Sequence, residues 1–430
     1  MSAQSGEVLG LTPAQAATTC PRQGVPRTTH PRLRAAALAL FVSVVACGES
    51  SSVPMLPYGA SNSLRTGASF AFEALLPLDG DFGKVGPVAV DESQRVYVAD
   101  VMRREIIVFD SLGKRQRVLG RRGEGPGEFQ FLNAMTIRDD TLYVFDLGQR
   151  RITLFAVTDD SLPLARTVPV FAQGRHTVKD VFIGPEQRYY LWIRPPELTA
   201  NTVTVGDGTV LIADGEGRLV ADSVMSLKGP EWLITRVGDG YAVQEMPFGK
   251  RTFVEIGSDG RLYTFWSGEG QLRVYDPDGT HLTVIPLPDL TNRRLDAGDI
   301  NILRESILEP GGALARRKVE WLDAAVEDGV IPSLFPSVAQ LVMDERDRLW
   351  IEPVGLAHRV RSTSFGLALE ASGGGMDLMM VDLSDGWYAN GRLPSAGRLA
   401  AVRDGRVYTV RSDDLGVESV MVYRIAMEGH

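Results

Sequence analysis

Two short stretches of the sequence, RVYVAD at 95–100 and TLYVFD at 141–146, repeat one pattern. In each copy a Tyr-Val strand ends in an aspartate (Asp100 and Asp146), and an Ile six positions later opens the next apolar run. The two tyrosines, Tyr97 and Tyr143, lie about 46 residues apart, which is the length of one four-stranded propeller blade. The repeat therefore predicts an all-β propeller.

Further strand-like runs with turn residues between them follow on both sides of this repeat. They predict six blades, with seven as the alternative. The expected strands of the first four blades are 85–90, 95–100, 106–110 and 114–119; 134–137, 142–145, 152–155 and 166–170; 178–183, 188–193, 203–213 and 219–227; and 252–257, 261–266, 271–276 and 281–287.

The last two blades are predicted from count and spacing. The fifth is expected to use 338–343, 347–352, 365–371 and 377–383, and the sixth 399–403, 406–410 and 419–425. We expect the N-terminal strand 71–78 to pair into the sixth blade, because such closure leaves no open sheet edge along the ring. The propeller domain is thus predicted to span 70–430.

A helical insertion is predicted between blades, over residues 289–330. Its apolar residues recur at helical spacing from Leu314 through Trp321 and Leu322 to Ala325, with Arg316 on the polar side. The insertion can pack on the propeller, cover one mouth of the channel or offer a surface to a partner.

The first 46 residues have the three parts of an export signal. A basic flank with four Arg and one Glu precedes an apolar run from Ala35 to Ala46, and Cys47 follows directly. The run is too short to span a bilayer as a helix. The segment looks like a bacterial lipoprotein signal, with an ordinary signal peptide as the alternative. This resemblance implies lipidation (diacylation) of Cys47 and a flexible tether over 47–69.

The charge balance bears on location and partners. The whole chain carries a net charge of −9, and removal of residues 1–46 would leave −12. An acidic domain disfavours nucleic acid as a partner and is repelled by anionic lipids, so membrane attachment must come from the lipid. Gly48 after the cysteine resembles lipoproteins sorted to the outer membrane. We therefore expect an exported protein, anchored in the bacterial envelope and facing the periplasm.

The first blade, with Tyr97–Asp100, Ile106–Asp110 and the following segment Gly123–Phe129, resembles an NHL-repeat blade. More specifically, the chain resembles the lipid-anchored six-bladed propeller proteins of bacterial envelopes. The family usually has Asn and Arg between the Asp and the next strand. Here these places hold Arg103 and Glu105 in the first blade, and Gln149 and Arg151 in the second. The resemblance therefore implies a fold and an address, and it transfers no functional residues.

Two sets of residues in the repeat are candidate site residues. Asp100 and Asp146 occupy equivalent places, which favours a structural role, since a catalytic acid is needed only once. A second set lies in two equivalent loops that are expected to project from one face: Arg103, Arg104, Gln149, Arg150 and Arg151. These side chains can bind a small anionic ligand, because guanidinium pairs with carboxylate or phosphate, or they can form a solvated rim.

The glycine-rich segment Gly120–Gly127 is predicted to be a connector between blades. A phosphate-binding loop leads from a strand into a helix and carries Lys-Ser/Thr, whereas this segment leads from one strand to another.

No concentrated catalytic motif is present in the sequence. It has no His-Glu-x-x-His zinc motif and no Gly-x-Ser-x-Gly elbow. We therefore predict a non-enzymatic binding scaffold for a small ligand or an envelope protein, without a cofactor. The alternative is a hydrolase or lyase of the propeller-lactonase type that holds Ca²⁺ in the channel through carboxylates from several blades; the sequence assigns no metal ligands.

Overall fold

The computed structural model describes the chain from residue 64 to residue 427. The described ranges are 64–158, 160–171, 178–193, 202–237, 240–308, 312–363, 366–413 and 415–427. The chain divides into the units Met1–Met55 and Leu56–His430, and all described residues lie in the second unit. The predictions for the signal segment and for Cys47 fall outside the described residues.

Three sheets have the four-stranded blade form that the repeat predicts. Each is an antiparallel ladder in sequence order. The first blade contains β3 (Val85–Val90), β4 (Val96–Asp100), β5 (Glu105–Phe109) and β6 (Arg115–Leu119); the second, β7 (Leu132–Arg138), β8 (Thr141–Asp146), β9 (Arg151–Ala156) and β10 (Leu164–Pro169); the fourth, β16 (Thr252–Ile256), β17 (Leu262–Trp266), β18 (Gln271–Tyr275) and β19 (His281–Pro286).

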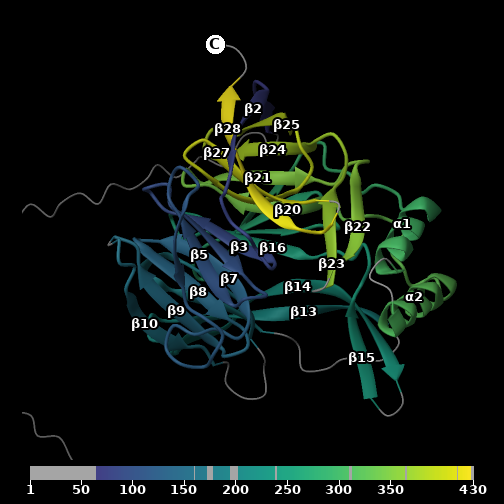
Figure 1. The fold of residues 1–430 in the computed structure, drawn as a ribbon, viewed down its shortest axis with the longest axis horizontal. Coiled ribbons are helices and arrows are strands. Elements are labelled where there is room, and N and C mark those ends of the chain that lie inside the picture. Colours follow the sequence, from purple (N-terminus) through teal and green to yellow (C-terminus); the bar gives the residue numbers. More distant parts are fainter. Residues whose placement is uncertain are drawn as a thin grey trace, which may run out of the picture. The chain divides into compact units, whose positions relative to one another are not determined.

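The third blade is larger than the sequence predicts. It has five strands: β11 (Val178–Ile183), β12 (Tyr189–Ile193), β13 (Thr202–Ala213), β14 (Leu219–Val237) and β15 (Gly240–Glu245). A short 3-10 helix, η1 (Pro185–Gln187), lies between β11 and β12. Strand β14 was expected to end near residue 227, but its ladder with β13 continues beyond a register shift, and β15 then pairs with its second half. In Figure 1, β13 and β14 run from the blade toward β15.

The fifth blade differs from the prediction in its outer strands. It consists of β20 (Val338–Met343), β21 (Arg348–Pro353), β24 (Met376–Asp382) and β25 (Trp387–Leu393). The expected third strand, 365–371, instead forms a separate hairpin of β22 (His358–Thr363) and β23 (Gly366–Ala371). The segment expected to be the fourth strand, 377–383, is therefore the third, and β25 was missed.

The sixth blade closes as predicted. Strands β26 (Arg398–Arg403), β27 (Arg406–Ser412) and β28 (Glu418–Met427) are joined by the N-terminal β2 (Phe70–Pro77), which pairs antiparallel with β28. At its first residue β2 also pairs with β25, and the two-residue β1 (Arg65–Thr66) pairs with the start of β25. Blades five and six are thereby joined in one hydrogen-bonded sheet.

The six blades form a closed ring. The first strand of each blade contacts the first strand of the next, in the order β3, β7, β11, β16, β20, β26 and back to β3. The ring confirms the six-bladed propeller, and these inner strands surround its central channel.

Among the described residues, six hydrophobic clusters lie between neighbouring blades. Val98 on β4 packs toward the sixth blade, and its neighbour Tyr97 packs toward the second. The same alternation recurs around the ring. Because both faces of each sheet are buried, the middle strands are apolar at almost every position. The sequence shows this in Tyr97–Ala99, all of which are buried.

The predicted helical insertion contains α1 (Ala297–Leu308) and α2 (Gly312–Glu327), between the fourth and fifth blades. Both helices lie at one side of the sheets, beside the β22–β23 hairpin (Figure 1). Leu303, Leu322 and Phe335 share one buried cluster with Val360 of the hairpin, so the apolar helix faces pack on the propeller domain. Among the described residues, no helix has the length and apolar character needed to cross a membrane.

Candidate functional site

The repeated aspartates hold the connections between blades. The buried Asp100 carboxylate accepts hydrogen bonds from the backbone amides of Gly83 (2.7 Å), Lys84 (3.3 Å), Met102 (3.1 Å) and Arg103 (3.0 Å). The first two amides belong to the segment that enters β3, and the last two to the turn after β4. Asp100 therefore ties an incoming connection to a turn of the same blade.

Asp146 repeats this arrangement in the second blade. Its carboxylate accepts hydrogen bonds from the backbone amides of Gln130 (2.6 Å), Phe131 (3.0 Å) and Gln149 (3.0 Å), and from the Gln149 side chain (3.0 Å). These contacts are structural, because every donor belongs to the blade or to the connection that enters it.

The loop candidates make mostly internal contacts. Arg103 donates to Asp81, at 2.8 Å from its carboxylate. Gln149 donates to the carbonyls of Gly123 (3.0 Å) and Glu128 (2.9 Å), and Arg151 donates to the same Glu128 carbonyl (2.7 Å). Arg104 and Arg150 occupy equivalent places, and both have positive φ, at 60° and 53°. The anion site in these loops stays a prediction.

The glycine-rich segment runs from β6 to β7, as a connector does. It is closed by its own groups: the Glu128 carboxylate accepts the Gly125 amide (2.8 Å) and the Arg121 guanidinium (2.7 Å). These two contacts hold the pKa of Glu128 below its usual value, with the Gly125 amide as the larger cause.

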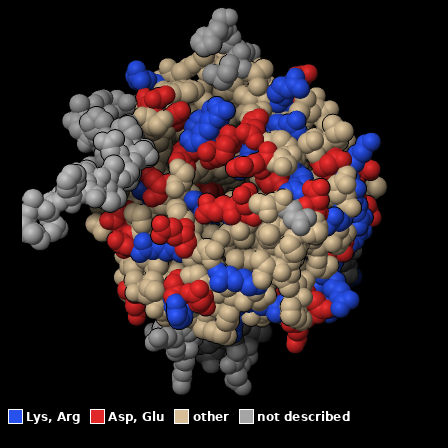
Figure 2. All heavy atoms as spheres, turned by 90° about the vertical axis from the view of Figure 1, so that its left-hand side faces the viewer, with Lys and Arg blue, Asp and Glu red and all other residues tan. Residues whose placement is uncertain are grey.

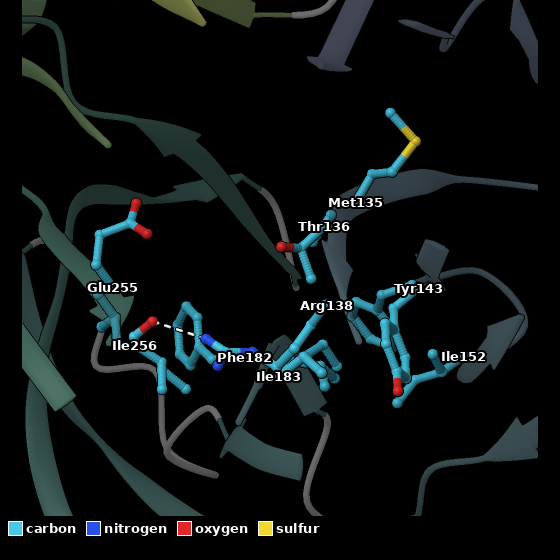
Figure 3. A pocket seen from close by; sticks show the side chains of 13 residues that line it. Met135, Thr136, Arg138, Tyr143, Ile152, Phe182, Ile183, Glu255 and Ile256 are labelled. Atoms are coloured by element: carbon cyan, nitrogen blue, oxygen red, sulfur yellow. Dashed lines mark hydrogen bonds between the residues drawn. The ribbon is translucent and has the colours of Figure 1, made fainter. Parts of the chain in front are cut away.

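Among the described residues, the central channel contains a cavity that can hold a ligand. Two adjoining cavities, of about 230 and 320 Å³, share the residues Met135, Thr136, Arg138, Glu255 and Ile256. Side chains from five of the six inner strands line the larger one. Its lining includes apolar side chains, among them Val88, Ile137, Val342, Met343 and Val402, but polar atoms supply most of its exposed surface. Figure 3 shows Glu255 on one side of the smaller cavity and Thr136 and Met135 on the other.

The larger cavity reaches the turns that follow the inner strands. The chain enters β20 from the helical insertion, so the turn after β20 lies at the end of the channel away from the helices. Figure 2 shows the molecule from the side opposite to the helices, with Asp and Glu side chains gathered around a central hollow. The charged residues that line the larger cavity are Arg138, Glu255, Asp344, Glu345, Asp347 and Arg403. We call the part of the larger cavity that these charged residues line the channel mouth.

Glu255 is an acid of the channel with a raised pKa. Desolvation raises its pKa to about 8, against the opposing effects of a hydrogen bond from the Met343 backbone amide and the nearby Arg138 charge. The carboxyl group is therefore mainly protonated at neutral pH. Arg138 is held in place by the carbonyls of Ile256 (2.8 Å) and Gly257 (3.3 Å), and Figure 3 shows its contact with Ile256.

A second acid with a raised pKa lies on β11. Desolvation raises the pKa of Asp180 to about 6, although Val181, Lys179 and Asn133 oppose the shift. Its carboxylate accepts a hydrogen bond from the Asn133 side chain (3.1 Å). Asp180 is thus engaged with β7, and it does not line either cavity.

Within the described ranges, no group of three or more His, Cys, Asp and Glu side chains is placed to hold a metal ion. Binding of Ca²⁺ in the channel stays a prediction.

Sequence reasoning missed Glu255, Arg138 and the rest of the channel mouth. A weak signal was present, because Arg138 directly follows the predicted strand 134–137 and Glu255 lies near the end of 252–257, each beside a largely apolar run. Only the ring closure shows that these residues face one cavity.

The comparisons with known proteins agree with this fold. The DUF5128 family, described as a 6-bladed beta-propeller, matches residues 79–228, which contain the first two blades and part of the third. No curated protein matches the chain. The chain is therefore similar to this family over about a third of its length.

Solved structures with a similar arrangement include three bacterial proteins. One is a "Putative exported protein" of Bacteroides fragilis (12% identity, TM-score 0.44, covering 84% of this chain and 95% of that one). Another is the PQQ-bound aldose sugar dehydrogenase of Streptomyces coelicolor (12% identity, TM-score 0.41, covering 84% of this chain and 99% of that one). The third is a gluconolactonase of Xanthomonas campestris (12% identity, TM-score 0.41, covering 82% of this chain and 98% of that one). The family match and the closed ring of inner strands together identify the fold of the described residues as a six-bladed β-propeller.

Proposed function

We propose that this protein is a non-enzymatic, lipid-anchored propeller of the bacterial envelope that binds a small ligand in its channel mouth. The observation that carries the proposal is the cavity of about 320 Å³, open at the end of the channel away from the helices and lined by both charged and apolar side chains. Binding pockets begin at about this size, and polar groups that converge on a pocket fix the orientation of its ligand.

Ligand capture from an envelope extract tests this function. The exported domain would be equilibrated with small molecules of the extract, washed, denatured and examined by mass spectrometry. Ala400→Trp places a large side chain in the lining of the mouth, whereas Val220→Trp changes an exposed position of β14. We expect a molecule that the wild type and Val220→Trp retain and Ala400→Trp loses.

Equal retention by Ala400→Trp, or no enriched molecule at all, would contradict binding in the channel. Hydrolysis of a lactone by the metal-loaded protein would favour the Ca²⁺-dependent alternative instead.

Anchoring through Cys47 is supported by the apolar run and the cysteine that follows it. We expect Cys47→Ala to move the protein from the membrane fraction to the soluble fraction, because one or two acyl chains supply the membrane affinity that an acidic domain lacks. Cys20→Ala, which lies within the expected signal, is the matched control and should stay with membranes. Sedimentation and labelling with a palmitate analogue measure both. Unchanged sedimentation of Cys47→Ala would exclude the lipid anchor.

A further inference from the structure

We infer that the channel mouth binds its ligand through a protonated amine, with Glu255 and Glu345 as the accepting carboxyl groups. This inference rests on the proposed function and adds the chemical class of the ligand. The inference is based on which carboxyl and guanidinium groups around the cavity already have hydrogen-bond partners and which still lack one.

Two of the four carboxyl groups at the mouth are already engaged. The Asp344 carboxylate accepts hydrogen bonds from the backbone amides of Arg346 and Arg348 (both 3.0 Å), the Arg348 side chain (2.8 Å) and the Trp350 indole (2.8 Å). Asp347 accepts from the amide and the hydroxyl of Ser258 (2.7 and 2.5 Å). These two acids hold the turns of the fourth and fifth blades and have little capacity left for a ligand.

Glu345 retains an unused acceptor. Its Oε2 accepts the Asp404 amide at 3.1 Å, whereas Oε1 is buried and has no hydrogen-bond partner. Arg346 Nε lies 3.5 Å from Oε1, within ion-pair distance only, and the Glu345 side chain is 18% exposed. A buried acceptor without a donor costs free energy, which a ligand N–H would recover.

Glu255 is the second acceptor. Its carboxyl group has the Met343 backbone amide as a donor, and it lines both parts of the cavity. Strands β16 and β20 are neighbours in the ring, so Glu255 lies beside the strand whose end carries Glu345. One ligand in the mouth can therefore lie next to both carboxyl groups.

The guanidinium groups are less available to an anion. Arg138 donates to two backbone carbonyls. Arg403 lies 3.8 Å from the Asp404 carboxylate and 3.7 Å from that of Glu92. The buried Nε–H of Arg403 has no hydrogen-bond partner, so it can donate to a hydroxyl or carbonyl oxygen of the same ligand. Because the carboxyl groups are more available than the guanidinium groups, the site favours a ligand with a cationic group and a neutral hydrogen-bond acceptor beside that group.

The cavity also limits the body of the ligand. Because a dry cavity of 150 Å³ accommodates benzene, about 320 Å³ corresponds to roughly twelve non-hydrogen atoms. Most of the exposed lining is polar, so the ligand should carry polar groups, and apolar side chains such as Val88 and Met343 can contact a small hydrocarbon or aromatic body on one side. A suitable probe is 2-amino-1-phenylethanol, with mandelate as its anionic counterpart and 1-phenylethane-1,2-diol as its neutral one.

Amine binding should depend on pH through Glu255, because an ammonium group pairs with the ionised carboxylate and the empty site is mainly protonated. With a pKa of about 8, the ionised fraction is about 1% at pH 6 and about half at pH 8, so the affinity should rise roughly 50-fold over this interval. Binding at pH 7 should release close to one proton. The charged groups that line the same cavity as Glu255 are Arg138, Asp344, Glu345, Asp347 and Arg403, and Arg138 is the one whose charge acts on the pKa of Glu255.

Calorimetric titration of the three probes between pH 6 and pH 8 tests the inference. We expect the amine to bind at least tenfold more tightly than mandelate and the diol at pH 8. Glu255→Gln should weaken the amine about tenfold and abolish the rise with pH, and Glu345→Gln should weaken it less. Asp259→Asn, in the turn after β16 and outside the cavity lining, should behave as the wild type.

Failure of the inference can be separated from failure of the channel function. Mandelate or diol binding that equals amine binding and is lost in Ala400→Trp would overturn the amine class and leave channel binding intact. Amine binding that Glu255→Gln leaves unchanged would overturn the role of Glu255. If none of the probes binds the folded protein, the amine inference falls, and capture from the extract still decides the channel function.

Discussion

A chain that begins at Leu78, and so lacks β1 and β2, is expected to lose its cooperative monomeric fold. Strand β2 fills the outer position of the sixth blade along β28, and Phe70 is buried against Trp350 with ring centroids 5.3 Å apart. Without β2 the long edge of β28 is unpaired, and an unpaired edge recruits other chains. Thermal unfolding should show a broad transition at a lower temperature. Size-exclusion chromatography should show aggregates or strand-exchanged oligomers.

A peptide with the sequence of β2, FAFEALLP, provides a direct check. We expect its addition in excess to restore monomeric, cooperatively folding protein, because it can occupy the vacant position. A variant that keeps β2 but carries Glu73→Ala is the control, since this side chain is exposed and pairs only with Arg424 at 3.2 Å. A shortened chain that remains monomeric and melts within a few degrees of the full domain would show that closure by β2 is dispensable.

The second large effect is expected for Asp100→Ala. The substitution leaves the four backbone amides around Asp100 without their acceptor in a buried place, so we expect a loss of about 3–5 kcal/mol in the free energy of unfolding. Asp146→Ala should have a similar effect in the second blade. Denaturant unfolding of both variants measures this.

Asp110→Ala is the matched control for this prediction. Asp110 also accepts backbone amides in a turn, from Leu112 (3.0 Å) and Lys114 (2.9 Å), but its turn lies open to solvent. Water can replace the lost acceptor there, so its effect should be clearly smaller. Equal losses at Asp100 and Asp110 would mean that the buried connections are not what makes Asp100 important.

The sequence predicted the parts of the fold that are set by local pattern. Tyr97–Asp100 and Tyr143–Asp146 could be recognised because strands buried on both faces are apolar throughout and end at a fixed polar residue. Spacing also revealed the insertion, since α2 has one apolar face. The closing strand could be predicted because a propeller needs its last edge covered.

The errors in the fifth blade have a physical cause. The β22–β23 hairpin alternates like any blade strand, and nothing local shows that it leaves the ring to pack on the helices. Strand β25 was missed because Asn390 and Gly391 resemble a turn. Gly391 is needed for another reason: a Cβ there would lie 2.4 Å from the Phe70 ring, so the glycine makes room for a residue far away in the sequence.

The channel mouth could not be predicted for a similar reason. Glu255 alternates with Phe253 as in a half-exposed strand, and its raised pKa arises from the closed ring around it. Arg138 ends β7 in the way that many strands end in a charged residue. The site forms only when inner strands from separate blades come together. The pattern of residues along the sequence does not show which of these strands will line one cavity.

The pairing of β2 with β28 also has a consequence for the timing of folding. The two strands are far apart in the chain: the contact between Glu73 and Arg424 spans 351 positions. Loop closure over such a length precedes any gain from the contact, which makes it a slow step. The first strand must therefore wait until the last one has been synthesised. A chain that is threaded through a membrane from its N-terminus would keep its ring open throughout the passage and close it only on the far side.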